Sequence, residues 1–219
     1  MTRLLFWDVD TQVDFFEPHG RLPIPGSGEI RPTLKQLTAF AHGHKVRILA
    51  SADDHAAGHR ELSDRPDYVE TFPPHCMRGT PGQKKIPETA LHDPLPIEPD
   101  HQDPATIGRR ALEQTGDLLL LKHWFDVFTN PNTLPIIRAI DPQVIVMYGV
   151  ATDGSARYAI DGLEQHRPHT RVYFVVDAAR AFNPKVAEHL LKEWAEEGVR
   201  LVKAEEILDG GVLDSYLTA

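Results

Sequence analysis

Polar side chains that could do chemistry stand at the ends of four apolar runs of the sequence. Asp10 follows "LLFWDV", Asp53 and His55 follow "VRILA" in "SADDH", Lys122 closes "LLLLK", and Ser155 follows "VIVMYGV" in "GVATDGSA". A hydroxyl, a carboxylate and a lysine can together perform nucleophilic hydrolysis, in which the carboxylate moves the proton of the attacking group. Carboxylate and imidazole ligands suit a divalent metal.

Each of these residues also has an ordinary structural explanation. A lysine at the end of a strand, such as Lys122, is commonly a surface residue. Ser155 and Asp153 both stand where an N-cap would stabilise the next helix. The chain contains 12 histidines, so some Asp and His neighbours are expected by chance. A catalytic interpretation therefore requires that the fold bring these residues together.

The pattern of apolar runs predicts that fold. Nearly continuous runs at 4–9, 46–50, 118–121, 144–150 and 172–176 are typical of strands buried on both faces. Helical patterns lie between them at 156–163 and 183–198, and a further helix is expected near Pro131, with Leu134, Ile137 and Ile140 facing the core. This alternation predicts an α/β fold with a mostly parallel sheet and a site at the carboxyl ends of the strands. Residues 58–117 break the alternation and are predicted to form a functional loop region.

Composition narrows the classes of partner. The 219 residues, 41% of them hydrophobic, suit a single domain over 1–219. Acidic residues outnumber Lys and Arg by 32 to 23, which argues against nucleic acid or an anionic membrane as partner and favours a small molecule. One cysteine, no recognisable signal peptide and no run long enough to span a bilayer favour a cytoplasmic protein. A homo-oligomer remains an alternative to a monomer.

Five motifs together resemble a known family. "VDTQVDFF", "SADDH", "FPPHCMRGTPG", the lysine of "LKHWFDVF" and "YGVATDGSA" occur in the order and at roughly the spacing of the isochorismatase-like cysteine hydrolases, specifically their nicotinamidase branch. The resemblance implies a three-layer α/β/α sandwich of Rossmann/flavodoxin-like topology. It also implies an Asp–Lys–Cys triad that hydrolyses a carbon–nitrogen amide bond through a thioester. The matching positions are Asp10, Lys122 and Ser155, where Ser155 replaces the family's cysteine.

The resemblance further implies an oxyanion hole, a metal and a ring-binding pair. The N–H groups of Ala151 and Ser155 would form the oxyanion hole, after a cis peptide bond between Val150 and Ala151. Phe15 and Phe72 would enclose a flat ring of a small amide substrate. The implied metal is zinc, with iron or manganese as alternatives. The implied ligands are Asp53, His55, His75 and, as a further candidate, His59.

Ser155 leaves several interpretations open. A serine hydroxyl is a far weaker acid than a thiol, whose pKa is about 8.5, and no histidine occupies a recognised triad position. Cys76 follows the candidate ligand His75 and does not match the nucleophile. The chain is therefore an inactivated Cys→Ser form, a slow native serine hydrolase or a silent ligand-binding homologue. A metal that activates water directly is a further alternative. The short segment after Lys122 leaves the identity of the amide open.

Overall fold

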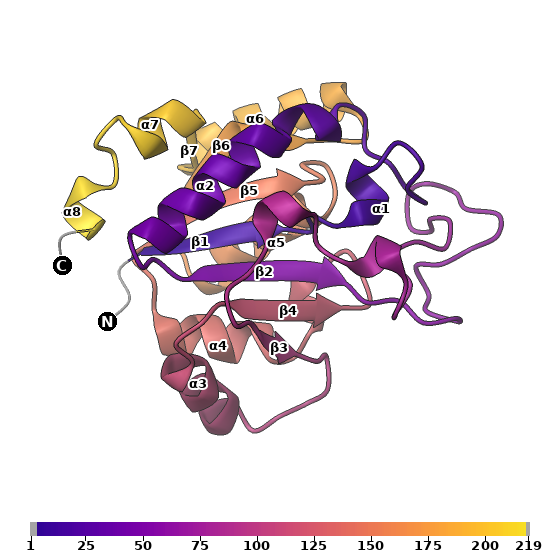
Figure 1. Cartoon of the computed structure of the whole chain (residues 1–219), viewed down its shortest axis with the longest axis horizontal. Helices are drawn as coiled ribbons and strands as arrows, with labels where there is room; N and C mark the ends of the chain where they lie inside the picture. Colours follow the sequence, from indigo (N-terminus) through magenta and orange to yellow (C-terminus); the bar gives the residue numbers. More distant parts are fainter. Residues whose placement is uncertain (1–3, 218–219) are drawn as a thin grey trace.

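A computed structural model describes residues 4–217, which form one seven-stranded sheet with helices on both faces (Figure 1). All strand pairs are parallel, in the order β3-β4-β2-β1-β5-β6-β7. The strands are β1 (Leu4–Val9), β2 (Ile48–Asp53), β3 (Leu95–Ile97), β4 (Leu118–Lys122), β5 (Val144–Val150), β6 (Arg171–Arg180) and β7 (Arg200–Val202). The predicted α/β class and parallel sheet are confirmed.

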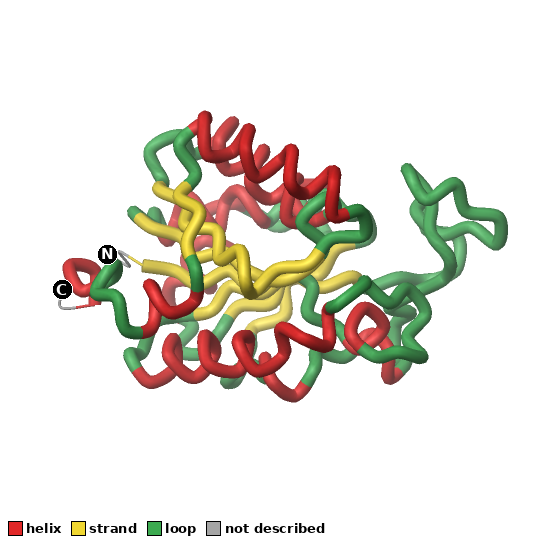
Figure 2. Tube along the Cα trace, turned by 90° about the horizontal axis from the view of Figure 1, so that it is seen from above, coloured by secondary structure: helices red, strands yellow, loops and turns green. Residues whose placement is uncertain are grey.

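Helices cover the sheet on both sides, as the view from above shows (Figure 2). The helices are α1 (Val13–Phe16), α2 (Arg31–Gly43), α3 (Pro104–Glu113), α4 (Thr133–Ile140), α5 (Ser155–His166), α6 (Pro184–Glu197), α7 (Ala204–Leu208) and α8 (Asp214–Leu217). Helices α2 and α7 contribute to one apolar cluster, and α3, α4, α5 and α6 contribute to the other. Between residues 4 and 217, no helix has the length and hydropathy needed to cross a bilayer.

The central strand shows why the sheet separates two cores. Leu4 and Phe6 of β1 belong to the cluster under α2, whereas Leu5, Trp7 and Val9 belong to the cluster on the opposite face. Successive side chains of a strand point to opposite faces, so a strand buried on both sides is apolar throughout. This arrangement explains why the strand sequences show continuous rather than alternating apolar runs.

The structure differs from the sequence prediction in a few elements. Strands β3 and β7 were not predicted, because each is only three residues long and lies at a sheet edge. Helix α4 begins at Thr133 rather than near Pro131, because residues 127–129 first form a 3-10 turn and the Thr133 hydroxyl donates to the Val127 carbonyl at 2.8 Å. Ile137 and Ile140 face the core as predicted, and Leu134 is only partly buried.

A long loop region lies beyond the carboxyl ends of the strands. Residues 54–94, which connect β2 to β3, contain only short 3-10 turns and project past the sheet (Figure 2). The loop region predicted at 58–117 therefore extends too far toward the C-terminus, because that stretch contains the regular elements β3 and α3. The sequence contained a signal for α3 in Asp103, a residue type that favours the N-cap. In the structure the Asp103 side chain accepts the N–H of Thr106 at 2.8 Å in that role.

Candidate functional site

Three of the predicted site residues meet at the carboxyl edge of the sheet. Asp10 directly follows β1, Lys122 ends β4 and Ser155 begins α5. Lys122 Nζ lies 2.9 Å from Asp10 Oδ2 and donates to Ser155 Oγ at 3.3 Å. The Ser51 hydroxyl donates to Asp10 Oδ1 at 2.7 Å and holds that carboxylate in place. The structure thus brings an acid, a lysine and a hydroxyl into direct contact.

Lys122 is a buried cation rather than a surface lysine. Its side chain is fully buried, and Nζ also donates to Asp53, its neighbour in the β2–β4 register. Burial alone would lower the pKa of Lys122, but the carboxylates of Asp10 and Asp53 outweigh burial and raise it. Burial raises the pKa of Asp10, although the Lys122 cation opposes this effect. Asp10 is therefore a stronger base than an exposed aspartate.

The residues that follow Asp10 position the neighbouring strand and loop. Gln12 clamps the end of β2, because its Nε2 donates to the Asp53 carbonyl at 2.8 Å and its Oε1 accepts the Asp53 N–H at 2.7 Å. Asp14 Oδ2 accepts the N–H of Cys76 at 2.7 Å and so fixes the residue next to His75. The motif "VDTQVDFF" therefore supplies one candidate reacting group, Asp10, and two side chains that position the metal candidates.

The turn before α5 presents Ser155 to Lys122. The Val150–Ala151 peptide bond is cis, as the resemblance implied. The preceding Gly149 has a φ of 118°, and a Cβ there would lie 2.1 Å from the Val9 carbonyl oxygen, so only glycine fits. The expected side-chain cap of α5 is absent, because the Asp153 carboxylate instead accepts the N–H groups of residues 182 and 183. Ser155 does not act as the N-cap either, which leaves its hydroxyl directed at Lys122.

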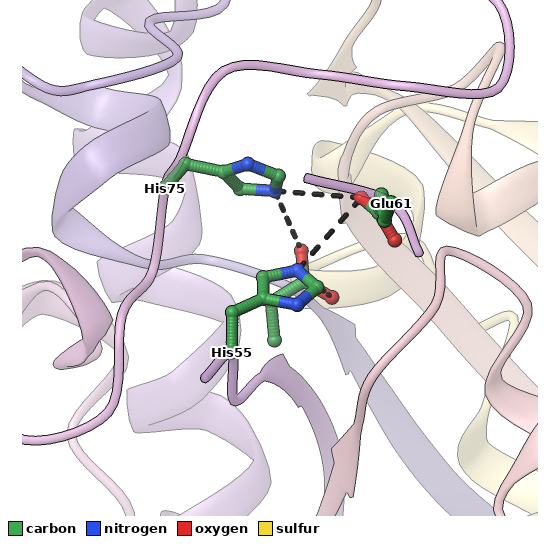
Figure 3. A group of neighbouring side chains, drawn as sticks. His55, Glu61 and His75 are labelled. Atoms are coloured by element: carbon green, nitrogen blue, oxygen red, sulfur yellow. Dashed lines mark ion pairs between the residues drawn. The ribbon is translucent and has the colours of Figure 1, made fainter. Parts of the chain in front are cut away.

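A second buried group adjoins the first, because Lys122 also contacts its member Asp53; its two histidines and Glu61 are drawn in Figure 3. Each member offers one ligand atom, and these atoms lie within 4.8 Å of one another. His75 Nε2 is 3.4 Å from Glu61 Oε1 and 3.5 Å from Asp53 Oδ2, and His55 Nε2 is 3.8 Å from Glu61 Oε1. Such convergence of two imidazoles and two carboxylates fits a divalent metal. The group consists of Asp53, His55, Glu61 and His75.

The two histidines show that the group suits a metal. Both ring nitrogens of His55 are buried without a hydrogen-bond partner, and burial lowers the pKa of His55 to about 4, so its ring is neutral and able to bind metal. The Nδ1 of His75 lies 2.8 Å from the Pro73 carbonyl, which leaves Nε2 facing the carboxylates. Although burial opposes it, hydrogen bonding to Asp53 and Glu61 raises the pKa of His75 to about 10, so the two carboxylates favour a positive charge that a divalent metal would supply in place of the proton.

Glu61, rather than His59, completes this group. The His59 side chain lies outside it, because its Nδ1 accepts the N–H of Ala56 at 3.2 Å and its ring packs 4.1 Å from that of His123. Sequence reasoning weighed only histidines after the D-x-H motif and so missed Glu61. The only signal for Glu61 in the sequence was a carboxylate within the predicted loop region. Loop carboxylates are too common for one to be chosen as a metal ligand on that basis.

The two groups border one cavity of about 440 Å³. Its lining includes Asp10, Ser155 and both carboxylates of the metal candidate, together with the rings of Phe15 and Phe72. The Phe15 ring is 5.5 Å from His75, whereas the Phe72 ring stacks on Phe182 at 5.8 Å.

The single cysteine has a structural role in the core. Cys76 is fully buried in the apolar cluster under α2, and burial raises the pKa of its thiol. Its protonated thiol is not a nucleophile of the cavity.

Comparisons with known proteins agree with this architecture. The family model described as the isochorismatase domain matches residues 4–206. The nicotinamidase/pyrazinamidase of Mycobacterium tuberculosis is 27% identical over 198 residues, which are 89% of this chain and 95% of that protein.

Solved structures share the fold. A pyrazinamidase of Pyrococcus horikoshii in complex with zinc has a TM-score of 0.71 and 22% identity, covering 92% of this chain and 99% of its own. An N-carbamoylsarcosine amidase from Thermoplasma acidophilum has a TM-score of 0.69 and 19% identity, covering 93% of this chain and 98% of its own. Since the family model spans nearly the whole sheet and both polar groups, the chain belongs to the isochorismatase family.

Proposed function

We propose that the protein is a metal-containing, nicotinamidase-like amidohydrolase that cleaves the carbon–nitrogen bond of a small, ring-bearing amide. The observation that supports this most strongly is the position of Lys122, which bonds to Asp10, Asp53 and Ser155, three residues that line one cavity. One cation thereby links the candidate triad to the candidate metal group. In this proposal Asp10 is the general base, Lys122 orients it, and Ser155 is the nucleophile.

The first half of the reaction forms an ester. Ser155 Oγ attacks the amide carbon while Asp10, whose carboxylate lies with the Ser155 hydroxyl around Lys122 Nζ, takes the hydroxyl proton. The proton then passes from Asp10 to the leaving nitrogen, the carbon–nitrogen bond breaks, and ammonia leaves. Water next attacks the ester, Asp10 accepts its proton, and the carboxylic acid is released as Ser155 regains a proton. The Lys122 cation favours the charged form of Asp10 between these steps.

The turn before α5 would hold the negative oxygen that develops on the amide. The N–H groups of Thr152, Gly154 and Ala156 already bond to carbonyl oxygens within the protein. We assign the oxyanion to the N–H groups of Ala151 and Ser155, which belong to the same turn, as the resemblance implied. Phe15 and Phe72 would contact the ring of the amide from the cavity walls.

Asp53, His55, Glu61 and His75 would hold the metal, with zinc as the first candidate and iron or manganese as alternatives. When bound there, a divalent metal supplies a positive charge that can bind a ring nitrogen of the substrate.

A silent ligand-binding homologue is the second candidate, and Ser155 itself favours it. A thiol with a pKa of about 8.5 is readily deprotonated by a neighbouring base, whereas an alcohol is not. The buried, lysine-paired Asp10 would then be retained for binding.

The test is ammonia release from nicotinamide and a panel of small amides. The parent protein and its Ser155→Cys variant are compared, each with and without added zinc or iron. We expect the cysteine variant to release ammonia, and Asp10→Asn in that background to abolish the release. Mass spectrometry of the quenched reaction should show an acyl group on residue 155.

The outcomes separate the candidates. Turnover by the cysteine variant alone identifies a cysteine hydrolase that lacks its nucleophile, and turnover by both identifies a serine hydrolase. Turnover that persists in Ser155→Ala identifies direct activation of water by the metal. Ligand and metal binding without turnover in any form would exclude the hydrolase and support the binding protein.

A further inference from the structure

Exposed apolar side chains gather at one place on the protein. Within residues 4–217 four large apolar side chains are strongly exposed, and three of them line the mouth of the catalytic cavity. These are Tyr68 at 63% exposure, Val69 at 75% and Val186 at 41%. The fourth, Leu112 at 51%, lies on α3 and lines no part of this cavity. Clustered exposed apolar surface commonly marks a binding site, whereas isolated residues such as Leu112 need no explanation.

The three residues come from two separate elements that both contribute to the lining of the cavity. Tyr68 and Val69 lie at the tip of the loop after β2, and Val186 lies in the first turn of α6. The tip has a defined conformation, because Asp67 Oδ1 accepts the N–H groups of Val69, Glu70 and Thr71 at 2.8–2.9 Å. The loop therefore holds Tyr68 and Val69 outward instead of folding them into the core.

The cavity is larger than the proposed reaction requires. A cavity of about 150 Å³ can hold a benzene ring. The cavity here measures about 440 Å³, so a single-ring amide seated on Ser155 would leave much of it unfilled. The lining of the cavity also includes apolar side chains, among them Leu22, Ile24 and Phe182.

Three polar side chains of this part of the lining, Asp153, Arg157 and Asn183, already have partners within the protein. The Asp153 carboxylate bonds to the backbone of residues 182 and 183, and the Asn183 side chain caps α6 by accepting the N–H groups of residues 185 and 186. Arg157 lies 3.5 Å from Asp161 along α5. An uncharged, apolar group suits this part of the cavity better than a charged one.

We propose that the substrate carries an uncharged apolar extension on the far side of the ring from its carboxamide, and that Tyr68, Val69 and Val186 bind this extension. The inference rests on the proposed amidohydrolase function, since the carboxamide must sit at Ser155 for the extension to reach the mouth. It narrows the substrate class from single-ring amides to aryl amides with an alkyl or aryl substituent. Continuity of the three residues with the catalytic cavity favours a substrate group over a second copy of the chain.

Calorimetric titration of the zinc-loaded protein with benzamide and 4-butylbenzamide tests this assignment without requiring turnover. We expect 4-butylbenzamide to bind roughly tenfold tighter or more, because the mouth removes its methylene groups from water. A Val69→Asp/Val186→Asp variant should lose most of this advantage and still bind benzamide normally. Leu112→Asp is the matched control, since it places the same charge on an exposed apolar position away from the cavity, and it should keep the full advantage.

The alternative results are distinct. Equal affinity for the two amides, or an advantage that Leu112→Asp reduces as much as the double variant does, would overturn the inference. Hydrolysis of nicotinamide by Ser155→Cys in the same preparation would show that the proposed function survives that result. Failure of every amide to bind and to react would instead remove the proposed function and the inference with it. A dimer in sedimentation velocity that Val69→Asp dissociates would assign the patch to a second copy and overturn the substrate assignment.

Discussion

Two groups of carboxylates in this protein differ in how their charge is balanced. The first lies at the floor of the cavity, is fully buried and surrounds Lys122. The second lies where α5 passes α6, is partly exposed and has Arg157 as its neighbouring cation at one end. The first group consists of Asp10, Asp53 and Glu61, and the second of Asp161, Glu164 and Glu197.

The difference shows what a buried negative charge requires. In the second group, burial and the repulsion of Glu197 and Asp161 raise the pKa of Glu164 to about 6. In the first group, burial by itself would raise the pKa of Asp53. The Lys122 cation and the bond to His75 outweigh burial, so the pKa of Asp53 is lowered. Concentrating charge in the interior costs free energy unless partners are present. A fold that keeps such an arrangement beside a cavity gives a physical reason to expect function there.

Removing Lys122, the cation of the first group, should have the largest effect on stability. Lys122→Met leaves Asp10 and Asp53 buried without their shared cation, and we expect the free energy of unfolding to fall by about 3–5 kcal/mol. Urea unfolding of the metal-free protein at pH 7 measures this loss. Adding Asp10→Asn to Lys122→Met should restore part of the stability, because one unpaired charge is removed.

The same comparison predicts a dependence on pH. Lys122 lowers the folded-state pKa of Asp53, so its stabilisation is present above the unfolded pKa of about 3.9 and is lost as the pH falls through the folded value. The stability gap between parent and Lys122→Met should therefore narrow in acid. A gap that is small at pH 7, or that widens as the pH falls, would show that Lys122 does not balance these carboxylates.

The next effect concerns metal affinity and separates Glu61 from His59. Glu61→Ala removes a buried oxygen that lies 3.4 Å from His75 Nε2, and we expect zinc affinity to fall by at least about tenfold. His59→Ala, only two residues away in the same loop, should leave the affinity unchanged. Competition with a chromogenic chelator gives both values. A loss in His59→Ala equal to that in Glu61→Ala would mean that the loop rearranges around the metal.

The three residues of the candidate triad could be predicted from the sequence. Asp10, Lys122 and Ser155 were predictable because each stands at a strand or helix end, and a parallel sheet brings such ends to one edge. The register that places Lys122 beside Asp53 follows from the same sheet. Apolar runs define these elements strongly, so the positions of the polar residues that follow them are well determined.

The loop residues were harder to predict because no periodic pattern determines their path. His75 was found through a motif, whereas Glu61 reaches the site only because the loop folds back, with the Phe72 N–H donating to the Glu61 carbonyl at 2.7 Å. Tyr68 and Val69 gave no sequence signal, since exposure depends on the turn that Asp67 holds. Long-range contacts of irregular backbone are set by tertiary structure, and a single sequence does not encode them in a recognisable spacing.

The smallest effect is expected in the second group of carboxylates, where neutralising one charge should stabilise the protein. Glu164 has a raised folded-state pKa, so its favourable contribution is present below the unfolded pKa of about 4.3 and is lost as the pH rises through about 6. Glu164→Gln should therefore be more stable than the parent at pH 8 and should lose this advantage near pH 4. Because the side chain is partly exposed, solvent screening limits the gain to less than about 1 kcal/mol. Thermal unfolding across this pH range measures it, with Glu196→Gln on the exposed part of α6 as the control. Equal gains in both variants would mean that reduced net charge, rather than the repulsion around Glu164, explains the stabilisation.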